Sequence, residues 1–83
     1  MPYYTYILEC VDGTYYIGST DNLYNRVAQH NEGHGASYTR SRLPAKLVYY
    51  EEFSNRMQAC KRERELKKLN KPQKKKLVEN SKK

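Results

Sequence analysis

The pattern of apolar and polar residues at the start of the chain predicts two strands joined by a tight turn. Residues 3–11 are rich in tyrosine, isoleucine, leucine and valine and contain no helix signal, which is typical of a strand. Asp12-Gly13 is a strong turn dipeptide, and residues 14–19 supply the return strand of a hairpin. Gly18 predicts either a bulge or a close approach of another group to the backbone.

The length of the hairpin loop decides which side chains share a face. A two-residue turn pairs Val11 with Thr14 and places Tyr6 and Tyr16 on opposite faces of the sheet. A loop that is one residue longer, with a bulge, places both tyrosines on one face. The sequence leaves both registers open.

A helix is expected after the hairpin. Thr20 or Asp21 can cap a helix that begins near Asn22, and the glycine-containing segment from Gly33 ends it. Residues 31–45 are polar and predict a long loop, which in a compact domain is more often functional or mobile than idle. Two stripes run along the surface of this predicted helix. One is apolar and consists of Leu23, Val27 and Ala28, and the other is polar and consists of Asn22, Arg26 and His30.

Residues 46–53 predict a third strand. Alternation along it places Leu47 and Tyr49 on one face and Val48 and Tyr50 on the other. Three strands of this kind suggest a small antiparallel sheet.

Two further helices are expected in the last third of the chain. Asn55 followed by Gln58 resembles a capping box at the start of the first, and Pro72 suits the first turn of the second. The predicted fold class is therefore α+β, similar to an α/β sandwich, with a three-stranded antiparallel sheet flanked by helices in the order β-β-α-β-α-α. A chain of 83 residues favours one domain, spanning residues 1–83.

Charged residues are distributed unevenly along the chain. Its net charge is +7, yet residues 1–55 hold four Lys/Arg against six Asp/Glu, whereas residues 56–83 hold twelve against three. A basic C-terminal third indicates a polyanionic partner such as nucleic acid, although lysines also serve simply as a solvated helix surface.

The cysteines and the apolar runs bear on location. Cys10 and Cys60 show neither a disulfide framework nor zinc-ligand spacing, and free buried thiols favour a reducing compartment. The N-terminal segment lacks signal-peptide features, and no apolar run approaches the roughly 20 residues that span a membrane. We therefore expect a cytoplasmic protein without membrane association.

Glu63 is a carboxylate on the apolar side of its predicted helix, near Ala59, Cys60 and Leu66. An ionised carboxylate is costly there unless it is paired or binds a metal. The structural alternative is a salt bridge, with Lys67 one helical turn later or with Arg26 across the core.

The other candidates also have ordinary explanations. Arg26 and His30 are common on surface helices, and Tyr6 and Tyr16 are common sheet residues. A tyrosine with a pKa near 10 is a poor base unless its environment lowers that value.

Taken together, these residues resemble the GIY-YIG nuclease domain family. The likeness runs from Tyr3 to about Val78 through Tyr4-Thr5-Tyr6, Tyr16-Ile17-Gly18, Arg26, His30 and the helical Glu63. The segments HNEGHGASYTR, LVYYEEF and ACKREREL resemble its small stand-alone bacterial branch. The chain departs from the family pattern at Tyr4 and Thr5, which replace glycine and isoleucine.

The resemblance implies an endonuclease that cuts phosphodiester bonds, in DNA repair or recombination, with one Mg²⁺ or Mn²⁺ ion. It implies that Glu63 holds the metal, Arg26 stabilises charge on the phosphate, Tyr6 or Tyr16 activates water, and His30 assists proton transfer or orientation. A metal ion and an arginine are suited to neutralising charge that develops on phosphate.

The expected substrate is nucleic acid, and specifically DNA. Four further residues are expected to contact it: Tyr38, Arg40, Arg42 and Lys67. Two alternatives stay open. One is a non-catalytic, basic nucleic-acid-binding module with the same fold, and the other is a subunit of a larger complex that needs a protein partner.

Overall fold

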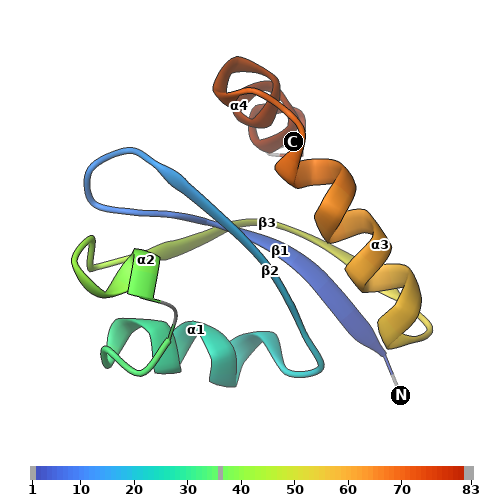
Figure 1. Cartoon of the computed structure of the whole chain (residues 1–83), viewed down its shortest axis with the longest axis horizontal. Helices are drawn as coiled ribbons and strands as arrows, with labels where there is room; N and C mark the ends of the chain where they lie inside the picture. Colours follow the sequence, from blue (N-terminus) through green and yellow to red (C-terminus); the bar gives the residue numbers. More distant parts are fainter. Residues whose placement is uncertain (1, 36, 82–83) are drawn as a thin grey trace.

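The computed structural model describes residues 2–35 and 37–81, and it forms a small sheet between two helical layers (Figure 1). The elements in chain order are β1 (Tyr3–Glu9), β2 (Tyr15–Thr20), α1 (Leu23–Asn31), α2 (Ser37–Arg40), β3 (Lys46–Phe53), α3 (Arg56–Lys67) and α4 (Lys71–Asn80). The sheet has the order β2-β1-β3, and β1 pairs antiparallel with both neighbours. The α+β fold and the order β-β-α-β-α-α are confirmed, with the short α2 added inside the predicted loop.

The hairpin adopts the longer of the two predicted loops. Cys10 N–H donates to the carbonyl of Thr14 at 2.8 Å, so that Val11, Asp12 and Gly13 form the connection. Gly13 has φ 84°, a left-handed conformation that glycine adopts without strain. Tyr6 is thus opposite Gly18, and Leu8 is opposite Tyr16. Both tyrosines consequently share one face of the sheet.

Two apolar clusters hold the layers together. On the side of α3 and α4, Ile7 and Ile17 pack with Leu66 and Val78. On the side of α1, the buried residues are Tyr6, Leu8 and Ala45, joined by Leu23, Val27 and Leu43. Alternation along β1 therefore sends successive side chains to different helical layers, as the period of a strand requires.

Asparagines cap the three longer helices. Asn22 accepts from the backbone of Asn25 and caps α1, so the caps predicted at Thr20 or Asp21 were wrong by one or two residues. Thr20 instead binds the backbone of Asn22, which fixes the turn before the helix. Asn55 caps α3 as predicted, and Asn70 forms a complete capping box with Gln73 at α4.

The side chains of the third strand are oriented differently from the prediction. A register shift between Ile7 and Leu8 interrupts the pairing of β1 with β3. Val48 and Tyr49 both pack against the Ile7 cluster, so strict alternation along residues 46–53 was wrong. An irregular pairing of this kind changes which side chains face inward, and periodicity cannot detect it.

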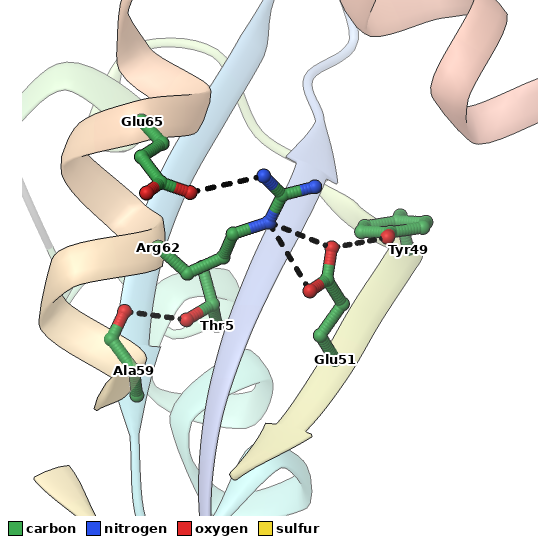
Figure 2. Close-up of polar contacts among 6 residues, drawn as sticks. All are labelled: Thr5, Tyr49, Glu51, Ala59, Arg62 and Glu65. Carbon is green, nitrogen blue, oxygen red and sulfur yellow. Dashed lines mark hydrogen bonds and ion pairs between the residues drawn. The ribbon is translucent and has the colours of Figure 1, made fainter.

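A polar network ties β3 to α3 (Figure 2). Arg62 Nε donates to both carboxylate oxygens of Glu51 at 3.1 Å, and its Nη1 donates to Glu65 at 3.1 Å. Tyr49 donates a short hydrogen bond to Glu51. Thr5, which is fully buried, donates to the Ala59 carbonyl at 2.6 Å. We call Tyr49, Glu51, Arg62 and Glu65 the β3 network.

No described helix is both long and apolar enough to cross a membrane.

Candidate active site at the edge of β2

The site is centred on Gly18, because the edge strand β2 lacks a side chain there. A Cβ at Gly18 would lie 2.6 Å from Tyr6 Oη and 3.2 Å from Tyr16 Cε2. The tyrosine rings, whose centroids are 6.4 Å apart, therefore lie over bare backbone. Of the two readings of Gly18, close approach is correct, because β2 pairs with β1 without a bulge at this position.

A buried chain of hydrogen bonds runs back from Tyr6. Tyr6 Oη lies 3.2 Å from His30 Nε2, and His30 Nδ1 lies 2.8 Å from Thr39 Oγ1. Tyr6 is 1% exposed, and His30 and Thr39 are 0% exposed. Gly35 allows this burial, since a Cβ there would lie 2.2 Å from His30 Nδ1. The histidine predicted on a polar stripe is thus fully enclosed, and both ring nitrogens are hydrogen-bonded.

Burial sets the protonation of this chain. It raises the pKa of Tyr6 to about 12, an effect that the hydrogen bond to Arg26 partly offsets. Burial also lowers the pKa of His30 below its usual value of 6.5, and the Arg26 charge adds to this effect. Near neutral pH both groups are therefore uncharged.

Arg26 provides the positive charge on the α1 side. Its Nη1 donates to Gln29 at 3.1 Å. Among the described residues, no carboxylate lies within 4.0 Å of its guanidinium. Arg26 also borders a polar hollow of ≈ 340 Å³, whose lining includes Ser19, Thr20 and the acidic Asp21. An arginine without a carboxylate partner beside a polar hollow is suited to bind an anion.

Glu63 reaches the same edge from the α3 side of the sheet. Ser19 Oγ donates to its Oε1 at 2.8 Å, and Lys67 Nζ lies 2.8 Å from its Oε2. The predicted salt bridge with Lys67 is therefore present. The Glu63 charge also contributes to the raised pKa of Tyr6, which is consistent with both groups meeting around Gly18. Tyr6, Tyr16, Arg26 and His30 thus share the α1 side, while Glu63 comes from the opposite layer.

The donor set at Glu63 is compatible with Mg²⁺ or Mn²⁺ but incomplete. In the described part of the chain, no group of three or more His, Cys, Asp or Glu side chains could hold a metal ion. Mg²⁺ commonly binds one or two carboxylates and completes its octahedron with water and substrate phosphate. Glu63, with the Ser19 hydroxyl beside it, fits that kind of site rather than an all-protein cage.

A second hollow, of ≈ 320 Å³, lies beside Tyr16. Its lining includes Tyr38, Lys67 and Lys74, together with Tyr15 and Ile17. The Tyr16 and Tyr38 ring centroids are 6.2 Å apart. We call this space the lysine hollow. Tyr16 and Lys67 therefore face solvent-accessible space that Tyr6 and His30 do not reach.

The four predicted substrate contacts differ in how far their side chains are exposed or already bonded within the protein. Arg42 bonds Asp12 and the Tyr38 carbonyl, and its guanidinium lies 4.2 Å from the Tyr38 ring centroid. Arg42 therefore connects the hairpin loop to α2. Arg40 at the end of α2 is exposed, as is Lys67. Tyr38, with 40% exposure, borders the lysine hollow.

A larger hollow lies elsewhere in the described part of the chain. It measures ≈ 520 Å³ between α1 and β3, and its lining is Leu23, Tyr24, Val27, Ala28 and Leu47. This lining is almost wholly apolar and lacks a cation for phosphate. The size of a hollow therefore does not locate the chemistry here.

Sequence reasoning missed the residues that support the site. Ser19 holds Glu63, Thr39 holds His30, and Gly35 makes room for the imidazole. Ser19 lies 44 positions from Glu63, and Thr39 lies nine positions from His30. Only the fold reveals those pairings.

Comparison with known proteins agrees with this geometry. The model of the GIY-YIG catalytic domain matches residues 2–76. The chain therefore belongs to the GIY-YIG family, a family of nuclease domains.

Within that family its relatives are small UPF0213 proteins of bacteria and archaea. One from Streptococcus pneumoniae serotype 4 is 51% identical over 71 residues, which cover 86% of this chain and 72% of that protein. One from Clostridium perfringens is 51% identical over 75 residues, covering 90% and 81%. The solution NMR structure of UPF0213 protein BH0048 from Bacillus halodurans is 42% identical, with a TM-score of 0.60 and coverage of 95% and 84%.

Proposed function

We propose that this protein is a divalent-metal-dependent endonuclease that hydrolyses phosphodiester bonds in DNA, and that residues 1–83 form one domain of this type. The observation that carries the proposal is the charge arrangement at the edge of β2. Among the described residues no carboxylate lies within 4.0 Å of the Arg26 guanidinium, and Glu63, from the other helical layer, pairs with the exposed Lys67. A bound phosphate would pair with the Arg26 guanidinium, and a metal ion on that phosphate would bind the Glu63 carboxylate.

Exposure separates the roles of the two tyrosines. Tyr6 is 1% exposed and its pKa is raised to about 12, so it is poorly placed to meet water and reluctant to ionise. Tyr16 borders the lysine hollow. We assign Tyr16 to hold the attacking water and, once ionised, to accept its proton.

His30 acts through Tyr6 in this scheme. Its ring is enclosed, with one nitrogen toward Tyr6 and the other toward Thr39. It is therefore a positioning residue that fixes the Tyr6 hydroxyl beside Arg26. The Tyr16 and His30 ring centroids are 5.1 Å apart, so His30 also packs against the reactive tyrosine.

In this scheme Arg26 and Glu63 stabilise the negative charge on the phosphate. Arg26 would donate hydrogen bonds to the non-bridging oxygens, which carry more charge in the transition state than in the substrate. Glu63 and Ser19 would hold Mg²⁺ or Mn²⁺, which supplies Lewis-acid stabilisation of the phosphate when bound. Lys67 and Lys74 would contact the neighbouring backbone phosphates.

A cleavage assay tests the proposal. Branched, nicked and single-stranded DNA, the structures that repair and recombination generate, would be incubated with Mg²⁺ or Mn²⁺. We expect Glu63→Ala to lower cutting at least about a hundredfold, by analogy with the removal of one charge-stabilising group. Glu51→Ala, from the β3 network, is the matched control and should still cut. Absence of cutting by the unaltered protein, or equal cutting by Glu63→Ala, would contradict the proposal.

A second candidate is a nucleic-acid-binding module without catalysis, acting alone or with a protein partner. It is favoured by the exposed lysines of α4, Lys71, Lys75 and Lys76. Such a module would bind DNA without a metal ion, with an affinity that falls steeply as salt rises. Binding that is unchanged by chelator, together with no cutting, would support this candidate over the nuclease.

A further inference from the structure

The carboxylate of Glu63 is already occupied by a cation of the protein itself. Lys67 Nζ lies 2.8 Å from Oε2, and Ser19 Oγ lies 2.8 Å from Oε1. The Glu63 side chain is 21% exposed, so the ion pair is partly shielded from water. Lys67 therefore lies against the carboxylate that a divalent cation would use.

Lys67 also lies next to a second space. Its side chain is 54% exposed and also borders the lysine hollow beside Tyr16, Tyr38 and Lys74. A lysine side chain is flexible, so a rotation about its own bonds can carry the ammonium from one place to the other. In the hollow, Lys67 would join Lys74 as a pair of cations suited to a backbone phosphate.

We propose that Lys67 is a mobile counter-ion, which pairs with Glu63 in the metal-free protein and moves into the lysine hollow to bind DNA phosphate when a divalent cation takes Glu63. This inference rests on the proposed function. An ammonium and a divalent cation at the same carboxylate repel each other, so binding of the cation weakens the Glu63–Lys67 ion pair. DNA that draws Lys67 away strengthens cation binding, and by linkage the cation strengthens DNA binding by the same factor.

The first test measures cation affinity without any reaction. Mg²⁺ would be titrated into ¹⁵N-labelled protein, and the backbone amide shifts around Glu63 would report binding. Lys67→Met and Lys67→Gln should bind Mg²⁺ about two- to fivefold more tightly, as expected for loss of one partly exposed ion pair. Lys68→Met, which removes a neighbouring exposed charge, controls for net charge, and Glu63→Gln controls for the site.

The outcomes separate the two proposals. Tighter binding in both Lys67 variants, but not in Lys68→Met, supports the counter-ion. Equal Mg²⁺ affinity in Lys67→Met and the unaltered protein, with binding lost in Glu63→Gln, overturns the counter-ion and leaves the nuclease proposal intact. No local shift in any variant, with DNA absent or bound, overturns both.

The second test measures the coupling. Affinity for a short DNA duplex would be compared with and without Ca²⁺, which replaces Mg²⁺ to limit cutting. We expect Ca²⁺ to tighten DNA binding in the unaltered protein and to have less effect in Lys67→Met. Lys74→Met should weaken DNA binding in both conditions but keep the Ca²⁺ effect. The same Ca²⁺ effect in Lys67→Met as in the unaltered protein would overturn the proposal.

Discussion

Two polar networks in this protein use the same residue types on two parts of one sheet. The β3 network joins Tyr49, Glu51 and Arg62, and the edge of β2 brings together Tyr6, Arg26 and the distant Glu63. In each network burial is the first cause of a raised tyrosine pKa, to about 12 for both Tyr49 and Tyr6. Residue composition therefore does not distinguish a structural network from a candidate active site.

The difference lies in how the charges are matched. In the β3 network, the Arg62 guanidinium binds two carboxylates, of Glu51 and Glu65, and Tyr49 adds a donor. At the β2 edge, the arginine and the glutamate do not pair with each other. Arg26 bonds an uncharged amide, and Glu63 relies on the exposed Lys67. Charges that pair with each other in a network stabilise the fold, whereas an arginine without a carboxylate partner beside a hollow can take a ligand.

The largest expected contrast comes from the two arginines. Arg26→Met should lower DNA cleavage roughly 10²–10³-fold, because the charge on phosphate loses its donor. Its unfolding free energy should fall by no more than about 3 kcal/mol, the value of its hydrogen bonds to Gln29 and Tyr6. Arg62→Met should leave cleavage nearly intact but destabilise by about 1–3 kcal/mol, because Glu51 stays half-buried without its cation. Cleavage assays and urea unfolding would measure these effects. If both variants lose only stability, the β2 edge is structural as well.

Gly18→Ala should have the next largest effect. Its Cβ would lie 2.6 Å from Tyr6 Oη and 2.8 Å from Tyr6 Cζ, and Tyr6 is buried. Overpacking of this kind costs about 1–3 kcal/mol and should also displace the hydroxyl from Arg26 and His30. Adding Tyr6→Phe should recover part of the lost stability, because it removes the nearest clashing atom. Additive losses in the double variant, measured by urea unfolding, would contradict this steric explanation.

The two tyrosines provide a smaller contrast. Tyr6→Phe leaves the buried His30 Nε2 without its partner and should cost about 1–3 kcal/mol. Tyr49→Phe leaves Glu51 still bound by Arg62, so it should cost less than about 1.5 kcal/mol. Both raised pKa values predict stability that is lost as pH rises from about 10 to about 12, since the unfolded state loses its protons first. Each variant should remove part of that loss in pH-dependent unfolding.

Much of the fold could be predicted because its signals are local. Strand composition, the turn at Asp12-Gly13 and the cap at Asn55 depend on neighbouring residues. The shared face of Tyr6 and Tyr16 depends on the register of the hairpin, which local chemistry left open. The bulge opposite Ile7 arises from pairing between distant strands and leaves no sequence pattern.

The site was predictable only as a set of residue types. Resemblance to the family indicated Arg26, His30 and Glu63, but not their partners. Ser19 meets Glu63 across 44 positions, and His30 meets Thr39 only because α2 folds over it. Burial was the property hardest to predict from the sequence. His30 belongs to a polar stripe of the predicted helix, yet the structure buries it fully.

That enclosure has a measurable consequence in acid. The folded state lowers the pKa of His30, first by burial and then through the Arg26 charge. The unfolded state therefore binds more protons once pH falls below about 6.5, and stability decreases as pH falls through that window. The slope cannot exceed about 1.4 kcal/mol per pH unit for one proton. His30→Asn should flatten this slope in urea unfolding at different pH values, whereas His34→Asn, at an exposed position, should preserve it. An unchanged slope in His30→Asn would show that the histidine protonates without opening the Tyr6–His30–Thr39 chain, and the β2 edge would then tolerate a buried charge close to Arg26.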